Sequence, residues 1–165
     1  MKKYLIAALC ALSLGQVCAQ DLKMRDVFNQ IPDSLMPYLS QNNRLDFIDF
    51  MDSNMKAEVR NKLGGMSEMT ALTDDSLSIR MSDALQVDIL LLRLDQPVDS
   101  IQQVVVYSQT FLTDSVYKDT VVLFYTTDWK PIHKEIPFNE IQRKRINELE
   151  LKNILKWNED KLNKS

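Results

Sequence analysis

The chain has 165 residues, with 20 basic and 23 acidic side chains, a formal net charge of −3 and a single histidine. A mildly acidic chain without a basic stripe is poorly matched to phosphate backbones, so the charge balance argues against binding to nucleic acid or to anionic membrane surfaces. Because imidazole is the usual proton carrier and a common zinc ligand near neutral pH, one histidine also argues against most catalytic triads and zinc sites. We therefore expect no catalytic residue, no metal and no cofactor.

The first nineteen residues have the pattern of a secretory signal peptide. Met1-Lys2-Lys3 is positively charged, residues 4–14 are mostly apolar, and Val17-Cys18-Ala19 precedes a cleavage point. The pattern predicts cleavage between Ala19 and Gln20, so that residues 1–19 are a signal peptide and residues 20–165 form the exported mature chain. A retained N-terminal anchor and a lipid anchor remain the alternatives, although the residues before Cys10 and Cys18 differ from the lipobox pattern.

The predicted mature chain contains no cysteine, because Cys10 and Cys18 both lie in the signal peptide. It would therefore have no disulfide bond, thiol nucleophile or thiolate ligand, and its stability would come from a hydrophobic core. Residues 20–165 are enough for one α+β domain. They contain no apolar stretch near the roughly 20 residues that span a bilayer, so we expect no transmembrane segment after cleavage.

The part of the mature chain nearest the N-terminus predicts helices. Residues 21–39 favour short helical pieces, because Pro32 and Pro37 interrupt them. Residues 44–63 predict one long helix, with Asn43 as its N-cap and Gly64-Gly65 as its C-terminal stop. The predicted buried stripe of this helix recurs at three- and four-residue steps and comprises Leu45, Ile48, Met51, Met55, Val59 and Leu63.

The middle of the chain predicts an antiparallel sheet. Alternating or continuous apolar residues predict strands at 77–82, 85–94, 101–112 and 116–126, with a short fifth strand at 132–136. Connections this short allow only antiparallel pairing. From Asn139 onward, charged residues and loosely spaced apolar residues predict an amphipathic helix. Together these elements predict an α+β fold with N-terminal helices, a central antiparallel β-meander of four to five strands, and a C-terminal amphipathic helix.

Several groups of residues that often carry chemistry are better explained here by structure. His133, beside a predicted strand, is expected to be exposed or half-buried. Asp46, Asp49 and Asp52 predict a solvated acidic face of a helix, since Ca²⁺ needs about six to eight oxygen ligands from a flexible loop. Asp74-Asp75 predicts a turn. Five methionines are expected to fill the core rather than line a lipid groove, namely Met51, Met55, Met66, Met69 and Met81.

An Asp-Ser/Thr-aliphatic motif recurs along the chain, more often than the roughly one copy that composition predicts. Its hydroxyl residues are Ser34, Ser76, Ser100, Ser115 and Thr120. The motif resembles the acceptor sequence of the general O-glycosylation system of exported Bacteroidetes proteins, which makes these hydroxyls candidate sugar attachment sites. The alternative is structural, since Asp-Ser favours turns and caps. Ser100 and Ser115 are the preferred candidates because they fall at predicted turns, and Thr120 is the weakest because it lies inside a predicted strand.

Five blocks of the mature chain together carry a wider resemblance. They are Met24-Arg25-Asp26-Val27-Phe28, Pro32 to Leu39, Asn42 to Phe50, Ala57 to Asn61, and Leu63-Gly64-Gly65. With these blocks the chain resembles an uncharacterised family of exported Bacteroidetes proteins, the domain of unknown function numbered 3256. The resemblance implies a Gram-negative cell, with the protein in the periplasm or at the outer surface. It implies no activity and no functional residue.

Export, an adequate core and the scarcity of catalytic residue types predict a non-enzymatic binding or accessory domain of the cell envelope. Its expected partner is a protein, a peptide or a lipid. A lipid carrier would need an apolar cavity lined by methionines and aromatic residues, whereas a peptide binder would need an uncovered strand edge that accepts an extra strand. The enzymatic alternative is a hydrolase, acting for instance on glycans, with two carboxyl groups about 5–10 Å apart in a cleft.

Overall fold

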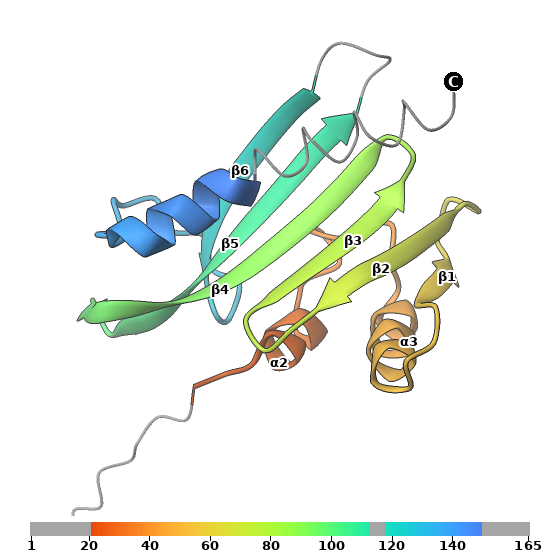
Figure 1. The fold of residues 1–165 in the computed structure, drawn as a ribbon, viewed down its shortest axis with the longest axis horizontal. Coiled ribbons are helices and arrows are strands. Elements are labelled where there is room, and N and C mark those ends of the chain that lie inside the picture. Colours follow the sequence, from red (N-terminus) through yellow and green to blue (C-terminus); the bar gives the residue numbers. More distant parts are fainter. Residues whose placement is uncertain (1–20, 113–117, 150–165) are drawn as a thin grey trace, which may run out of the picture.

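A computed structural model describes residues 21–112 and 118–149. Its centre is a six-stranded antiparallel sheet in which each strand pairs with the strands next to it in sequence (Figure 1). The predicted α+β fold and β-meander are therefore confirmed, with more strands than the four to five expected. The strands are β1 (Glu58–Arg60), β2 (Met66–Leu72), β3 (Ser76–Ser82), β4 (Leu85–Val98), β5 (Ile101–Leu112) and β6 (Lys118–Thr126).

The central strands follow the predicted hydrophobic pattern. In β3, Leu77 and Ile79 are buried and lie opposite Ile89 and Val87 of β4. Leu90, which points to the other face of the sheet, is buried as well. This part of the sheet is therefore covered on both faces, as the continuous apolar run in β4 predicted.

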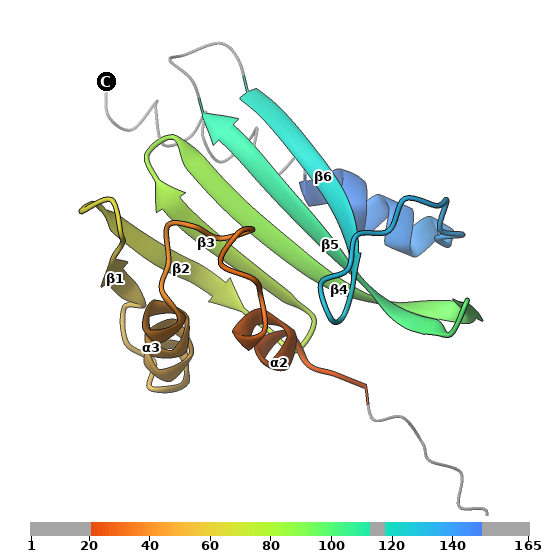
Figure 2. The ribbon, with the colours of Figure 1, turned by 180° about the vertical axis from the view of Figure 1, so that it is seen from behind.

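One face of the sheet carries two helices, α2 (Met24–Asn29) and α3 (Gln41–Asp52), and the chain that joins them (Figure 2). The short helical pieces predicted for residues 21–39 are confirmed by α2 and by the turns that follow it. This N-terminal layer packs onto the sheet and forms the largest hydrophobic core. The buried residues that this layer contributes to the core are Met24, Val27, Phe28, Ile31, Met36, Leu39, Phe47 and Ile48.

The helix predicted for residues 44–63 is wrong at both ends. The helix α3 covers Gln41–Asp52, and its N-cap is Ser40 rather than Asn43. Ser40 Oγ accepts a hydrogen bond from the Asn43 N–H (3.1 Å), while Asn43 Oδ1 accepts one from the Ser40 N–H (3.0 Å). This reciprocal capping box starts the helix earlier than predicted. Just past the other end, Asn54 has a φ of 53°, a left-handed conformation that a helix does not continue through.

The buried stripe predicted for that helix is also wrong in part. Leu45, Met55 and Leu63 are 44%, 53% and 73% exposed, whereas Phe47 is fully buried. Val59 is buried, but it lies in β1 and not on a helix. The apolar residues keep a three- and four-residue spacing by coincidence through a helix, a loop and a strand. A prediction from this periodicity alone therefore treated three separate elements as one helix.

The Gly64-Gly65 pair forms the turn between β1 and β2 instead of a helix C-cap. Gly64 has a φ of +83°, in the region that favours glycine. Asn61 stabilises the turn, because its Oδ1 accepts hydrogen bonds from the Leu63 and Gly65 N–H groups (3.0 and 3.1 Å). The prediction missed β1 altogether. It also missed β2, whose buried positions are Ser67 and Met69, so that apolar alternation hardly marks this strand.

The opposite face of β4, β5 and β6 is covered by residues 132–138 and by helical residues 140–149 (Figure 1). The fifth strand predicted at 132–136 is not formed: Pro131 makes an isolated bridge to Tyr125, and the Ile132 N–H donates to the Phe124 carbonyl. The predicted C-terminal helix is present over 140–149, and the rest of that prediction lies outside the described residues. None of the helices in the described ranges has the length and apolar character needed to cross a membrane.

Candidate functional site

The strand β4 extends past its neighbour β3. The first residue of β3, Ser76, lies opposite Leu90, and one further hydrogen bond runs from the Leu91 N–H to the Asp75 carbonyl (2.8 Å). Beyond that point β4 continues to Val98 and pairs only with β5, as the long hairpin in Figure 1. We call residues 91–98 the β4 arm. In the described structure, one backbone edge of this arm has no neighbouring strand.

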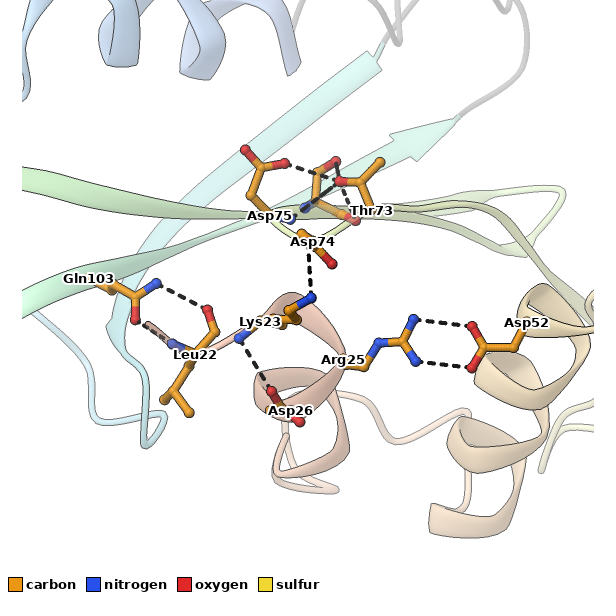
Figure 3. Close-up of polar contacts among 10 residues, drawn as sticks. Leu22, Lys23, Arg25, Asp26, Asp52, Thr73, Asp74, Asp75 and Gln103 are labelled. Atoms are coloured by element: carbon orange, nitrogen blue, oxygen red, sulfur yellow. Dashed lines mark hydrogen bonds and ion pairs between the residues drawn. The ribbon is translucent and has the colours of Figure 1, made fainter. Parts of the chain in front are cut away.

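The N-terminal residues form one wall along the β4 arm (Figure 3). The Leu22 N–H donates to Gln103 Oε1 (3.0 Å), and Gln103 Nε2 donates to the Leu22 carbonyl (3.1 Å). The next residue, Lys23, pairs through Nζ with the Asp74 carboxylate (3.1 Å) in the turn between β2 and β3. The segment is thus held both to β5 and to the turn that precedes β3.

The start of the C-terminal helix forms the opposite wall. Asn139 and Gln142 cap the helix reciprocally: Asn139 Oδ1 accepts the Gln142 N–H (2.8 Å), and Gln142 Oε1 accepts the Asn139 N–H (2.9 Å). The same two side chains reach the β4 arm. Asn139 Nδ2 donates to both carboxylate oxygens of Asp95 (3.1 and 3.0 Å), and Gln142 Nε2 donates to the Arg93 carbonyl (2.5 Å).

Between these walls lies a groove of about 520 Å³, which we call the β4 groove. Charged residues of both signs line it, including the ion pairs Asp21–Arg93 and Asp75–Arg145. Such a groove offers hydrogen-bond donors and acceptors without strongly attracting either a cation or an anion. Its lining residues are Asp21, Leu22, Lys23, Asp74, Asp75, Leu91, Leu92, Arg93, Asp95, Gln103, Asn139, Ile141, Gln142 and Arg145.

Carboxyl groups with clearly shifted pKa values lie elsewhere in the described structure. A catalytic proton donor needs a raised pKa, because it must keep its proton near neutral pH. The carboxyl groups with a resolved shift instead have a lowered pKa, each mainly because a cationic side chain donates a hydrogen bond to it. They are Asp33 beside Arg44, Asp99 beside Lys134 and Asp128 beside Lys130. The charged form is favoured in all three, which is the reverse of what an acid catalyst requires.

Asp46, Asp49, Asp52 and His133 lie outside the groove, whereas Asp74 and Asp75 line it. Asp46 and Asp49 are exposed on α3, as predicted for a solvated face. The Asp52 carboxylate accepts two hydrogen bonds from Arg25 (3.0 and 3.1 Å; Figure 3). His133 is exposed in the chain after β6. Over residues 21–112 and 118–149, no three His, Cys, Asp or Glu side chains are grouped so that they could hold a metal ion.

The hydroxyl groups of the Asp-Ser/Thr motif differ in accessibility. Ser34 is exposed in the turn after α2. In contrast, Ser76 Oγ is hydrogen-bonded to Thr73 Oγ1 (2.7 Å), and Thr120 Oγ1 lies 3.2 Å from Thr110 Oγ1 between β5 and β6. Ser115 and the predicted cleavage residues Ala19 and Gln20 lie outside the described residues.

Ser100 is exposed at the tip of a hairpin. With Asp99 it forms the exposed two-residue tip of the β4–β5 hairpin, between the paired residues Val98 and Ile101. Asp99 and Ser100 both have positive φ angles, 47° and 70°. Hairpin tips of this kind favour Asn-Gly or Asp-Gly, because glycine adopts the second conformation at no steric cost. Turn chemistry therefore gives a weak explanation for the serine at this position.

The methionines do not gather around a cavity in the described structure. Met69 and Met81 are buried in the core, as predicted, and Met51 is half-buried against it, whereas Met55 and Met66 are exposed, contrary to the prediction. No methionine lines the β4 groove or a second cavity of about 460 Å³ beside β6. That second cavity is lined by Phe124, Lys134, Glu135, Ile136, Phe138, Arg143, Ile146 and Asn147.

Sequence reasoning missed the β4 groove, although one signal of it was present. The strand predicted at 85–94 is longer than the one predicted at 77–82, so part of its edge was bound to extend past its partner. Asp74-Asp75 forms the turn that the sequence predicted, but its position beside the groove follows from sheet register. The contact between Leu22 and Gln103 joins distant parts of the chain, and no local pattern encodes it.

These features define an α+β domain in which an antiparallel meander carries helices on both faces and a mixed-charge groove borders an uncovered strand edge. The chain belongs to the family described as Protein of unknown function (DUF3256), whose model matches residues 15–159. The resemblance predicted from the sequence blocks is thereby confirmed.

A solved structure, that of a domain of an uncharacterized protein from Porphyromonas gingivalis W83, is similar in fold. The TM-score is 0.55 at 21% sequence identity, and the similarity covers 70% of this chain and 58% of that chain. This chain thus spans little more than half the length of the solved domain, and at this identity the likeness supports the fold alone. No curated protein matches the chain.

Proposed function

We propose that residues 20–165 are exported after removal of residues 1–19 and act in the periplasm or at the outer surface of a Gram-negative cell. There the chain serves as a non-enzymatic binding or accessory domain, and its β4 groove holds a segment of a partner protein. The groove itself carries this proposal, because it places a strand edge that has no neighbouring strand between two walls of hydrogen-bonding side chains.

The ion pairs of the groove walls support a role in binding rather than in folding. The side chains of Lys23 and Asp74 remain 56% and 72% exposed, and those of Arg93 and Asp21 remain 63% and 45% exposed. Ion pairs this exposed contribute about 0–1 kcal/mol each to stability. The fold therefore depends little on them, and their charges can exchange partners with a ligand at low cost.

The two alternative functions have less support. A lipid carrier requires an apolar cavity with methionines and aromatic residues. The lining of the β4 groove contains neither, and the lining of the second cavity contains Phe124 and Phe138 but also three charged residues and no methionine. A hydrolase with two carboxylates requires a free acidic pair facing the cleft. In the groove, Asp75 is paired with Arg145 and Asp95 accepts hydrogen bonds from Asn139, so these carboxylates already serve to hold the walls.

Removal of residues 1–19 would bring the new N-terminus close to the N-terminal wall of the groove. Asp21 pairs with Arg93 at the rim of the groove. A cut between Ala19 and Gln20 leaves a single residue ahead of Asp21, so the mature chain would begin beside the groove.

Photocrosslinking in the native host tests the binding role. Ile141 lines the groove and Leu63 lies in the turn between β1 and β2, and the two side chains are equally exposed at 73%. We expect a chain with p-benzoylphenylalanine in place of Ile141 to form a light-dependent adduct with an envelope protein, and the matched Leu63 variant to form none. Absence of the Ile141 adduct, or equal adducts from both positions, contradicts the proposal.

We also propose that Ser100 carries an O-linked sugar. Its exposed position at a hairpin tip, in a conformation that favours glycine, supports this choice over Ser34, Ser76 and Thr120. Intact-mass measurement of protein from the native host reports the cleavage site and any sugar together. We expect a chain that begins at Gln20 and carries added sugar mass, which disappears in Ser100→Ala. An unmodified chain that begins at Gln20 would exclude the sugar while supporting export.

A further inference from the structure

We infer that the partner segment in the β4 groove is an extended peptide that pairs with the β4 arm as an added antiparallel strand, in line with β3. The inference rests on the proposed binding role of the groove and specifies the chemistry of its ligand. Its starting point is the backbone of the arm, since backbone groups recognise an extended peptide whatever its side chains are.

Every second residue of β4 turns its backbone groups toward β3. Leu91 is one of them, because its N–H donates to the Asp75 carbonyl (2.8 Å). Strand geometry makes Arg93 the next residue on that side. Because β3 begins at Ser76, no strand of the described structure faces Arg93. The N–H and carbonyl of Arg93 therefore point to where an added strand would lie.

Gln142 already occupies the place of one hydrogen bond that an added strand would make. Its side chain is almost fully buried, and its Nε2 donates to the Arg93 carbonyl (2.5 Å). A peptide residue opposite Arg93 would donate its own N–H to the same oxygen. Gln142 Nε2 thus makes the hydrogen bond that a backbone N–H of the bound peptide would make. It protects the strand edge while no peptide is bound, as side chains at strand edges commonly do.

The geometry restricts the peptide. The residue opposite Arg93 must have an N–H, so proline is excluded there. Side chains of an added strand alternate between the two walls, with Leu22 and Lys23 on one side and Ile141 and Arg145 on the other. Because both walls mix charged and apolar residues, the groove suits a peptide of mixed polarity rather than a run of one charge.

A phage library of random twelve-residue peptides, selected on folded residues 20–165, supplies the probe. The most enriched sequence is then synthesised with an N-methyl group at each backbone nitrogen in turn. An added strand bonds to its neighbour through every second residue. We therefore expect affinity losses of about tenfold or more at alternate positions and small changes between them. A peptide held only by its side chains would lose affinity without this alternation.

Amide hydrogen exchange locates the bound peptide. We expect the peptide to slow exchange at the Arg93 amide by about tenfold or more, because that N–H gains an acceptor. The other long sheet edge belongs to β6, and the Val122 amide lies on that strand. Slowed exchange at Val122 with no change at Arg93 would place the peptide on the wrong edge and overturn the inference.

Substitution of Gln142 tests its protective role. Gln142→Glu keeps an oxygen that accepts the Asn139 N–H, so the helix cap is retained, but it removes the donor to the Arg93 carbonyl. We expect peptide affinity to rise about threefold to tenfold, because the guest no longer displaces that donor. Gln102→Glu adds the same charge at an exposed position on the neighbouring strand and should leave the affinity unchanged.

The experiments separate this inference from the proposed function. Failure to enrich any peptide, loss of affinity without alternation, or unchanged exchange at Arg93 overturns strand addition. If the Ile141 adduct persists in that case, the groove binds its partner in another way and the proposed function stands. If the adduct is absent as well, both proposals fall.

Discussion

Two aromatic side chains, Tyr107 and Trp129, fasten the N-terminal layer to the sheet. The Tyr107 hydroxyl donates to the Leu35 carbonyl (2.7 Å), and Trp129 Nε1 donates to the Val27 carbonyl (2.9 Å). Their rings meet edge to face, with centroids 6.2 Å apart. Each side chain therefore buries an apolar ring while its polar atom satisfies a carbonyl that has no strand partner.

We expect Tyr107→Phe to lower the free energy of unfolding by about 1–2 kcal/mol, because the ring still packs but the Leu35 carbonyl loses its donor. Gln109 Nε2, which donates to the Tyr107 hydroxyl (3.1 Å), loses its acceptor as well. Urea unfolding at pH 7 measures the change. The control is Tyr38→Phe, which removes a hydroxyl with no hydrogen bond in the described structure and should cost less than about 0.5 kcal/mol. Equal costs for the two variants would refute this role of Tyr107.

The same hydroxyl makes stability depend on pH. Burial raises the pKa of Tyr107 above its usual value, so the folded chain keeps this proton when the unfolded chain releases it near about pH 10. Above that pH the unfolded state binds fewer protons, and stability falls as the pH rises. Phenylalanine has no such proton. We therefore expect the stability advantage of the wild type over Tyr107→Phe to shrink between pH 8 and pH 11, measured by urea unfolding; a constant advantage would contradict this.

The prediction of a helix or strand succeeded where the sequence marks both of its ends, and it failed where an end is not marked. The strand predicted at 101–112 matches β5, because turn residues and a dense apolar run mark both of its ends. The helix predicted at 44–63 fails because the turn at Ser53 and Asn54 leaves no gap in the apolar spacing. Hydrophobic periodicity therefore does not show where this helix ends. Its end depends on turn conformation and capping, which are set by φ at single residues.

Paired truncations on α3 test the corrected buried face. Phe47 is fully buried, whereas Leu45, which belonged to the predicted stripe, is 44% exposed. We expect Phe47→Ala to lower the free energy of unfolding by about 3–5 kcal/mol and Leu45→Ala by less than about 1 kcal/mol. Chemical denaturation measures both. Similar losses at the two positions would favour the original stripe over the observed one.

The start of α3 can be tested in the same way. Ser40→Ala removes the hydroxyl that accepts the Asn43 N–H, and we expect a loss of about 1 kcal/mol. Ser53→Ala, at the other end of the helix, removes an exposed hydroxyl and should change the stability by less than about 0.5 kcal/mol. Thermal unfolding of the two variants gives the comparison. If Ser40→Ala left the stability unchanged, the capping box would not stabilise the helix.

In the molecule as a whole, the two ends of the described chain meet the same strand from opposite faces of the sheet. Residues 21–23 lie along the β4 arm on the side of α2, and residues 139–145 lie along it on the other side (Figures 1 and 2). The sequence predicts each of the two flanking segments separately. It cannot predict the groove between them, because that depends on sheet register and on contacts such as Asp21 with Arg93.

The N-terminal wall should loosen without unfolding the domain when Gln103 is replaced by alanine. Gln103 makes both hydrogen bonds to the Leu22 backbone, and these bonds are exposed, so we expect a stability loss of about 1 kcal/mol or less. The Leu22 amide loses its acceptor, and its hydrogen exchange should become about tenfold faster or more. If the groove binds a partner, the adduct from Ile141 should weaken too.

Gln102→Ala is the matched control, because Gln102 is the preceding residue of β5 and its exposed side chain points to the opposite face. It should leave both the exchange of the Leu22 amide and the Ile141 adduct unchanged. If Leu22 exchanged at the same rate in the two variants, the ion pairs of Asp21 and Lys23 would be enough to hold the segment. Gln103 would then not build the wall, and the conformation of the groove would depend on charge rather than on backbone hydrogen bonds.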